Sequence, residues 1–131
     1  MSMSVGPVGQ IQISVDDIDA AERFYGEVLG IPKLYRFGKL SFFDCAGVRL
    51  FIEEFDKRPF VPASSVVYFR TTDIAASFRE LKLKGVEFID EPHLIAPMQD
   101  HDLWMVFFKD SAGNVLGLMH EAPKGYSAAA G

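Results

Sequence analysis

The sequence predicts an α+β fold made of two similar halves, each with a helix that covers one face of a mixed sheet. An alternating stretch followed by a helical stretch occurs twice, in 10–31 and again in 66–86. Each copy is followed by two strand-like segments that flank a turn. Two copies are too few for a solenoid. We therefore expect the two halves to pair around a shared core.

The first copy begins as a half-buried strand. Ile11, Ile13 and Val15 alternate with polar residues, which is the period of a strand with one face in the core. Asp17 is placed to cap a helix through its carboxylate, and Gly30 suits the left-handed position that ends one. The apolar residues at the spacing of one buried helical stripe are Ile18, Ala21, Phe24, Tyr25, Val28 and Leu29.

The second copy repeats this pattern. Val67, Phe69 and Thr71 alternate with Val66, Tyr68 and Arg70. Asp73 stands where a helix cap is expected. Gly85 is the expected end of that helix. The buried stripe begins with Ile74, Phe78 and Leu81.

Two hairpins follow the two helices. Segments 40–44 and 48–53 flank an Ala-Gly turn, and segments 104–109 and 114–120 flank the turn Asp-Ser-Ala-Gly. Each half therefore has the order β-α-β-β.

The remaining segments are predicted to be short strands or connections. There is room for one more short strand at 34–37 or 87–89. The stretch 55–64 contains two prolines and is interpreted as a linker, and 92–102 as a second loop rich in Pro and His. The last residues, 123–131, form a small, polar, flexible tail.

The composition excludes several classes of protein. The chain has 131 residues, 49% apolar and 24% charged, which is typical of one globular domain. A net charge of -5 argues against nucleic acid or an anionic membrane as the partner. The single Cys45 excludes a disulfide framework, and the N-terminus lacks a secretory signal, so we expect a cytoplasmic protein.

One face of the predicted sheet is unusually polar for a protein core. The residues on it are Gln10, Gln12, Ser14, Arg49, Tyr68 and Arg70. Such alternation predicts either a solvated face or the wall of a cavity, and the bulky aromatics at neighbouring positions favour the cavity.

The first copy resembles the first module of the vicinal oxygen chelate superfamily. The residues that carry the resemblance are Ile11-x-Ile13-x-Val15-x-Asp17-Ile18, then Phe24-Tyr25 and Val28-Leu29-Gly30-Ile31. That superfamily includes glyoxalase I, extradiol dioxygenases and bleomycin resistance proteins. Phe108-Lys109-Asp110-x-x-Gly113-Asn114 resembles the hairpin turn of its second module.

The resemblance covers residues 8–122 and implies two paired βαβββ modules, about 8–56 and 65–122. These would form a cupped sheet around a ligand cavity, with the helices on the outer face, in a homodimer.

The resemblance also implies where a metal would be held. Metal-dependent members use one ligand from each of four strands, and these positions here are Gln10, Arg49, Val66 and Gly117. Valine and glycine offer no side-chain donor, and arginine repels a cation, whereas a divalent ion needs several N, O or S ligands. We therefore expect no metal and no cofactor at these positions, as in the metal-free resistance proteins that sequester a drug.

The sequence thus predicts a glyoxalase/bleomycin-resistance-like protein that binds a small organic molecule. Arginine side chains suit an anionic group, glutamines can hydrogen-bond a ligand, and aromatic side chains can line a wall for a flat one. The competing interpretations are a salt bridge with Glu53 or another nearby acid, or solvent exposure, for the two arginines, and a hydrogen bond between the two glutamines. For the tryptophan the competing interpretation is a core or interface position. The candidate ligand-binding residues are Gln10, Gln12, Arg49, Tyr68, Arg70 and Trp104.

Two other functions stay open at this point. The first is a metal-dependent lyase, isomerase or dioxygenase that uses a non-standard ligand set drawn from Gln10, Glu53, His93 or His101. The second is a structural or regulatory module whose cup is filled and binds no ligand.

Overall fold

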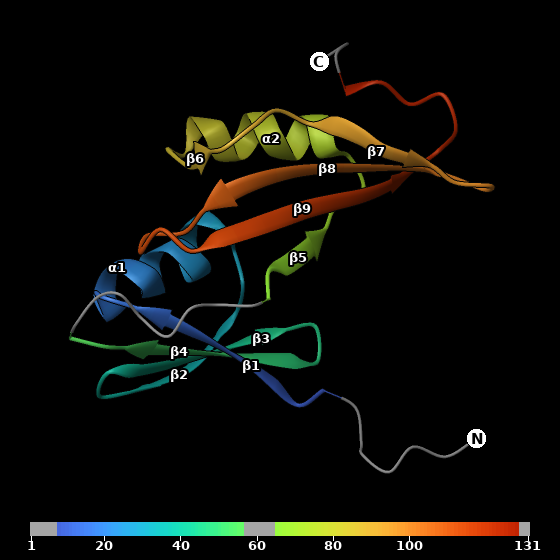
Figure 1. The fold of residues 1–131 in the computed structure, drawn as a ribbon. Coiled ribbons are helices and arrows are strands. Elements are labelled where there is room, and N and C mark those ends of the chain that lie inside the picture. Colours follow the sequence, from blue (N-terminus) through green and yellow to red (C-terminus); the bar gives the residue numbers. More distant parts are fainter. Residues whose placement is uncertain (1–7, 57–64, 129–131) are drawn as a thin grey trace, which may run out of the picture. The chain divides into compact units, whose positions relative to one another are not determined.

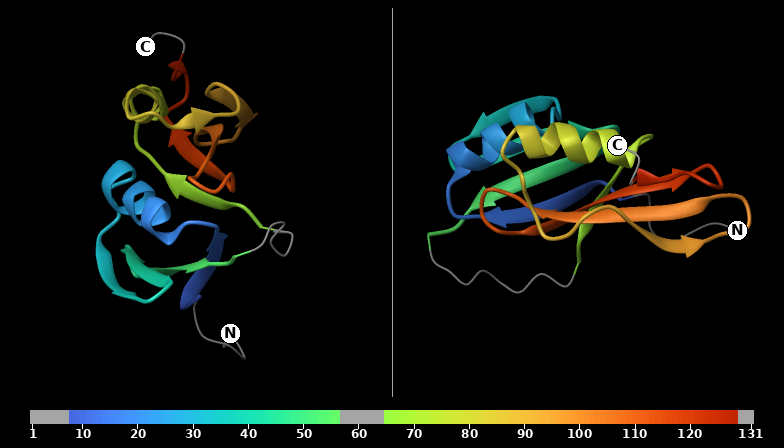
Figure 2. Two further views of the ribbon diagram at one scale, coloured as in Figure 1. Left: turned by 90° about the vertical axis from the view of Figure 1, so that its left-hand side faces the viewer. Right: turned by 90° about the horizontal axis from the view of Figure 1, so that it is seen from above.

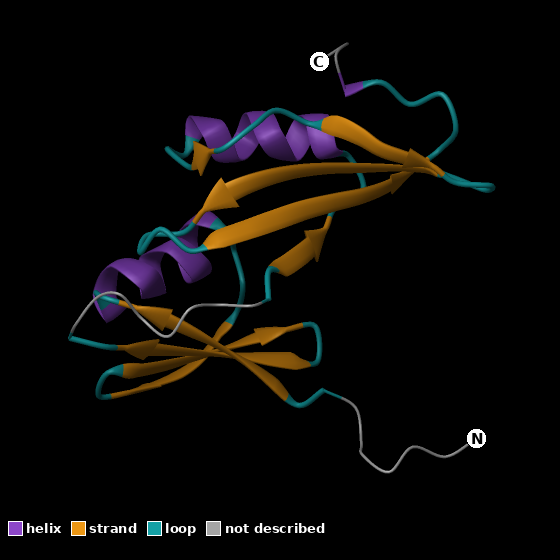
Figure 3. Ribbon diagram, viewed as in Figure 1, coloured by secondary structure: helices purple, strands orange, loops and turns teal. Residues whose placement is uncertain are grey.

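The structure is a computed structural model that describes residues 8–56 and 65–128. The chain divides into two compact units, Met1–Pro62 and Ala63–Gly131. Each unit holds one sheet and its own helix, which confirms the predicted α+β class (Figures 1 and 3). Most of the predicted linker 55–64 lies outside the described residues.

The first unit has the order βαβββ, as the resemblance implied. Its sheet has the strand order β1-β4-β3-β2, with β1 parallel to β4 and the other pairs antiparallel. The elements are β1 (Gln10–Val15), α1 (Ile18–Arg23), η1 (Phe24–Val28), β2 (Lys33–Phe37), β3 (Leu40–Cys45) and β4 (Val48–Glu54).

The helix of the first unit begins where the sequence predicts. The Asp17 carboxylate accepts from the N–H groups of Asp19 and Ala20, both at 3.1 Å. Gly30 ends the helical region at φ +77°, which glycine adopts at little cost. The widening of the helix into the π-helical turns of η1 is not visible in the sequence pattern.

One face of the first sheet is covered by this helical segment. Alternate residues of the strands are buried against it, because α1 packs on β3 and β4. An added Cβ at Gly26 would lie 3.3 Å from Phe43 Cε2, so the small residue allows the helix to approach the sheet. The buried apolar residues of β1, β3 and β4 are Ile13, Val15, Phe43, Leu50 and Ile52. Among residues 8–56, no helix covers the opposite face.

The second unit repeats the arrangement with one extra strand. Its sheet has the order β5-β9-β8-β6, and β7 also pairs with β8. Helix α2 packs on β8 and β9, and Figure 2 shows it along one face of that sheet. The elements are β5 (Val67–Arg70), α2 (Ile74–Leu83), β6 (Glu87–Phe88), β7 (His93–Pro97), β8 (Asp102–Lys109) and β9 (Val115–Ala122).

The segments between the main elements form more strands than the sequence predicts. Both positions proposed for one extra strand, 34–37 and 87–89, form strands (β2 and β6). The prediction that 92–102 is a loop is wrong for its first half, which forms β7. Proline is tolerated there because β7 pairs on one side only, with β8, and Pro97 is its last residue.

The first part of the predicted tail is anchored to the second unit. The Tyr126 hydroxyl donates to Asp73 Oδ1 at 2.8 Å and accepts from the N–H of Ala75 at 3.1 Å. Lys124 Nζ donates to Asp102 Oδ1 at 2.7 Å. Residues 129–131 of the tail lie outside the described residues.

In the described part of the chain, no helix is both long enough and apolar enough to cross a membrane.

Candidate functional site

The helix-free face of the first sheet, called the open face here, gathers three of the predicted site residues. Strands β1 and β4 are parallel neighbours in which Gln10 pairs with Arg49, and Gln12 pairs with Phe51. Paired residues project to the same side of a sheet. The structure therefore brings Gln10, Gln12 and Arg49 together, as the alternation predicted.

A row of stacked aromatic rings lies on the same open face. The rings of Phe42 and Phe51 are 5.0 Å apart and inclined by 4°, and those of Tyr35 and Phe42 are 4.6 Å apart and inclined by 24°. Tyr35 keeps 48% of its surface exposed. We call Tyr35, Phe42 and Phe51 the aromatic row. Its flat, partly exposed rings offer an apolar surface on which a planar molecule can stack.

Arg49 stands beside this row, exposed to solvent, with Asp44 of β3 as its cross-strand partner on the open face. Its Cζ lies 5.9 Å from the centre of the Phe42 ring, a cation–π distance. Within residues 8–56 and 65–128, the Arg49 guanidinium forms no ion pair. Gln12 donates to Ser14 Oγ at 3.0 Å and not to Gln10. The open face thus places an arginine and two exposed amides at the edge of an aromatic surface.

The second sheet has its own helix-free face, which carries Tyr68. Tyr68 pairs with Gly117, which in turn pairs with Phe107. The rings of Tyr68 and Phe107 meet edge to face at 5.8 Å. Because Gly117 has no side chain, the Tyr68 ring lies directly over its backbone: an added Cβ would be 2.7 Å from Tyr68 Cδ2.

Arg70 lies on the same face of the second sheet and is already paired. Its guanidinium forms a hydrogen-bonded ion pair with Glu121. His101 Nε2 lies 3.4 Å from the other Glu121 oxygen. Arg70 and Glu121 also line a pocket of about 690 Å³ with Thr71 and Thr72. The salt-bridge interpretation of Arg70 therefore describes the structure, whereas that of Arg49 does not.

Trp104 is not brought together with the other predicted residues. It pairs with His120, and it lies three positions before Phe107 on β8, so the two side chains project to opposite faces. The Trp104 ring contacts Tyr126 at 5.7 Å on the face that α2 covers. An aromatic wall made jointly by Trp104 and Tyr68 is therefore not possible in this fold.

The four positions implied for a metal do not fit a divalent ion. In the first sheet, the partner of Gln10 is the cationic Arg49. In the second sheet, the Tyr68 ring fills the space where a ligand side chain at Gly117 would begin. Among the described residues, no group of three or more His, Cys, Asp or Glu is placed to hold a metal. His93 and His101, the alternative ligands, contact the Glu91 carbonyl and the Asp100 carboxylate, each at 2.8 Å.

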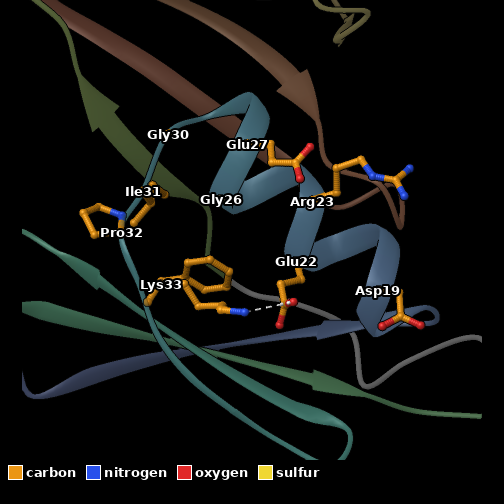
Figure 4. A pocket seen from close by; sticks show the side chains of 10 residues that line it. Asp19, Glu22, Arg23, Gly26, Glu27, Gly30, Ile31, Pro32 and Lys33 are labelled. Atoms are coloured by element: carbon orange, nitrogen blue, oxygen red, sulfur yellow. Dashed lines mark hydrogen bonds and ion pairs between the residues drawn. The ribbon is translucent and has the colours of Figure 1, made fainter.

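A pocket that the sequence did not predict lies beside α1 and η1 (Figure 4). Its volume is about 540 Å³, and its charges come from Asp19, Glu22, Arg23, Glu27 and Lys33. Burial alone would raise the pKa of Glu22, but hydrogen bonds from Ser41 and Lys33 outweigh it and hold that pKa below its ordinary value. Glu22 is thus an ionised, paired group that ties the helix to β2 and β3.

Cys45 has the environment of an unreactive thiol. It is half-buried, and burial together with the Asp44 carboxylate raises the pKa of the thiol. Because the thiolate is the nucleophile, a raised pKa disfavours covalent chemistry at this residue.

The chain is similar to known proteins in family and in fold. The family described as the Glyoxalase/Bleomycin resistance protein/Dioxygenase superfamily matches residues 8–118. No curated protein matches the sequence. Many solved structures match the fold.

Three of these structures show the range of proteins that share the fold. A glyoxalase/bleomycin resistance protein/dioxygenase from Alicyclobacillus acidocaldarius is 19% identical, with a TM-score of 0.70, and the match covers 91% of this chain and 95% of that one. Lactoylglutathione lyase from Agrobacterium tumefaciens is 20% identical, with a TM-score of 0.68 and coverage of 90% and 96%. TnmS3, an antibiotic binding protein from Streptomyces sp. CB03234, is 24% identical, with a TM-score of 0.68 and coverage of 94% and 100%. At these identities the likeness shows the fold alone.

Proposed function

Given that the chain belongs to the glyoxalase/bleomycin resistance protein/dioxygenase superfamily, we propose that it binds a small, planar organic molecule without the help of a metal ion. The family includes enzymes as well as binding proteins, so the choice rests on the site and not on the fold. The observation that carries the proposal is the aromatic row with the unpaired Arg49 beside it.

The chemistry of the open face defines the class of ligand. A planar ring system stacks on Phe42, Phe51 and Tyr35, since aromatic surfaces gain from offset stacking as well as from burial. An anionic oxygen of the ligand pairs with the Arg49 guanidinium, which presents a planar fork of donors. Gln10 and Gln12 supply neutral hydrogen bonds at the polar edge.

Tyr68 and Arg70 lie on the sheet of the second unit, and the site proposed on the first unit does not include them. The Tyr68 ring is 43% exposed. Arg70 must share its charge with Glu121, so an anion that pairs with it competes with an existing bond.

Sequestration is favoured over catalysis by the residues of the open face. Activating an ordinary organic substrate needs a metal, a nucleophile or a general base close to the ligand. The metal positions hold Arg49 and Gly117, which do not fit an ion. Of the remaining side chains there, glutamine and the phenylalanines cannot accept a proton from a substrate at neutral pH. The face also carries two carboxylates, Asp44 opposite Arg49 and Glu53 opposite Ser14. Asp44 already accepts from the N–H of Gly47 at 3.0 Å, and Glu53 is the general-base candidate of the enzymatic alternative.

The test is a thermal-shift screen of the full chain with planar aromatic carboxylates and their neutral amides, each with and without EDTA. A ligand at roughly a hundredfold excess over its Kd should stabilise the protein by about 2.7 kcal/mol, with or without EDTA. After prolonged incubation the compound should be recovered chemically unchanged.

Two variants connect the binding to the open face. Arg49→Gln should weaken binding of the carboxylate by about five- to tenfold, and Arg23→Gln on α1 should leave it unchanged. Stabilisation that needs an added metal, or equal binding by Arg49→Gln and the parent chain, would contradict the proposal. Conversion of the compound to a product would support the enzymatic alternative instead.

A further inference from the structure

The face of the second sheet that carries α2 contains a pocket of about 570 Å³. This volume lies in the range of small-molecule sites. The pocket lies between α2, the start of β7 and the indole of Trp104. The residues that line it include Phe78, Arg79, Glu91, Leu94 and Trp104.

The walls of this pocket are mainly apolar and well supported. Phe78 projects from α2, and its ring meets that of Phe88 edge to face at 4.6 Å. Leu94 comes from β7 and keeps 46% of its surface exposed. Trp104 of β8 completes the wall. Two aromatic side chains and a leucine therefore surround a space in which a flat ring can lie.

Trp104, which lines this pocket, also carries an unsatisfied donor. Its Nε1 is buried and has no hydrogen-bond partner among the residues that the structure describes. Buried donors are nearly always paired, because leaving one unpaired costs free energy. An acceptor supplied by a ligand would offset that cost after a small rotation of the indole.

The charges at the pocket favour a ligand with a single negative charge. Arg79 on α2 lines the pocket and supplies the cation. Glu91 lines it as well, and its carbonyl oxygen contacts His93 Nδ1 at 2.8 Å. Arg79 and Glu91 give the lining one cation and one carboxylate, and His93 lines the pocket as well. A monoanion that pairs with Arg79 is favoured over a dianion, which Glu91 repels more strongly.

We propose that this pocket is a second ligand site, which binds a small aromatic monocarboxylate with its ring against Phe78 and Trp104 and its carboxylate toward Arg79. The site is independent of the open face of the first sheet. It also lies on the opposite side of the second sheet from Tyr68 and Arg70.

The single tryptophan of the chain makes the test specific. The ¹⁵N-labelled full chain is titrated with 2-naphthoate, and the one indole N–H cross-peak is followed by NMR. We expect a saturable downfield shift of the indole proton, as an N–H that gains an acceptor shows. The neutral 2-naphthamide should bind about fivefold more weakly, because it cannot form the ion pair with Arg79.

Variants separate this pocket from the open face. Arg79→Gln should weaken the naphthoate shift by about fivefold, and Leu94→Asp, at an exposed position, should abolish it by placing a negative charge in the wall. Arg49→Gln on the first sheet should leave it unchanged. The inference is overturned if the indole signal stays fixed up to millimolar naphthoate, if Leu94→Asp binds like the parent chain, or if Arg49→Gln alone removes the shift.

Discussion

Tyr68 and Gly117 show how one missing side chain shapes a surface. The Tyr68 ring rests on the backbone of Gly117 and meets Phe107 at its edge. Glycine inside a strand weakens it, and a close approach by another group is a usual reason for its presence. Here that group is the Tyr68 ring, so the pair forms a single packing unit.

Replacing Gly117 by alanine should therefore destabilise the protein by about 1–2 kcal/mol, because the new Cβ would lie 2.7 Å from Tyr68 Cδ2 and force the ring away. In a Tyr68→Ala background the same change should gain about 0.5 kcal/mol, since alanine then has room and costs less entropy than glycine. Urea unfolding measures both values. Gly9→Ala, with nothing within 4 Å, is the control. An equal cost in both backgrounds would contradict this account.

Asp73 and Tyr126 are a second pair, in which the tyrosine hydroxyl lowers the pKa of the carboxyl group. The hydrogen bond from the Tyr126 hydroxyl, with another from the Ala76 N–H, lowers the pKa of Asp73 below its ordinary value. A depressed carboxyl pKa means that the ionised form stabilises the fold. That stability is complete above the unfolded-state pKa of about 3.9 and is lost as the pH falls through the lower folded-state pKa.

Tyr126→Phe should consequently raise the pKa of Asp73 toward its ordinary value. The acid-induced loss of stability that Asp73 contributes should then become smaller, because the loss begins at the unfolded-state pKa, which is unchanged, and ends at the folded-state pKa, which is now nearer to it. An NMR titration of the Asp73 carboxyl carbon in the parent and variant chains measures the shift. Tyr35→Phe, on the first sheet, should leave the Asp73 titration unchanged. If the Asp73 midpoint were the same in the Tyr126→Phe and parent chains, the hydroxyl would not be its main stabilising partner.

Among the elements, helix α1 combines a local cap with a distant one. Asp17 accepts from two N–H groups of the first turn, as the local sequence predicts. The N–H of Ile18 instead donates to Glu54 Oε1 of β4 at 2.9 Å. A helix has four N–H groups at its start without internal partners. Here two side chains far apart in the sequence accept from three of them.

The local cap can be measured by substitution. Asp17→Ala should cost about 1 kcal/mol of unfolding free energy, because two N–H groups lose their acceptor, and Asp17→Asn should cost much less. Chemical denaturation gives both values. The interpretation fails if asparagine is as damaging as alanine, since the charge and not the cap would then be the stabilising feature.

Strand β7 shows where element prediction from the sequence fails. The segment contains proline and lacks clean alternation, so its pattern indicates a loop. The strand forms because β8 offers free backbone groups at its edge, to which 93–97 can pair with a register shift between Leu94 and Ala96. Proline is harmful only where its missing N–H is needed, and the sequence does not say which strands will be at an edge.

For the whole molecule, the central prediction concerns metal removal. Dialysis against EDTA should leave the thermal midpoint and the binding of a planar carboxylate unchanged, because Arg49 and Gly117 replace ligands that an ion would need. Elemental analysis of the purified protein is the accompanying measurement. A tightly held transition metal in stoichiometric amount would be incompatible with the proposal.

The sequence by itself determined both helices with their starts and ends, and the first strand: the alternation of β1, the caps Asp17 and Asp73, and the left-handed glycines 30 and 85. It also indicated that Gln10, Gln12 and Arg49 share a face. These features depend on residues a few positions apart, which local periodicity and turn chemistry control.

Only the tertiary structure decided which predicted site residues meet. It paired Arg70 with Glu121, seated Tyr68 on Gly117, and placed Trp104 against Tyr126 on the other side of its sheet. Each of these contacts joins strands or segments that are distant in the chain. The register between them follows from packing the whole sheet, because a shift of one residue turns every side chain to the opposite face.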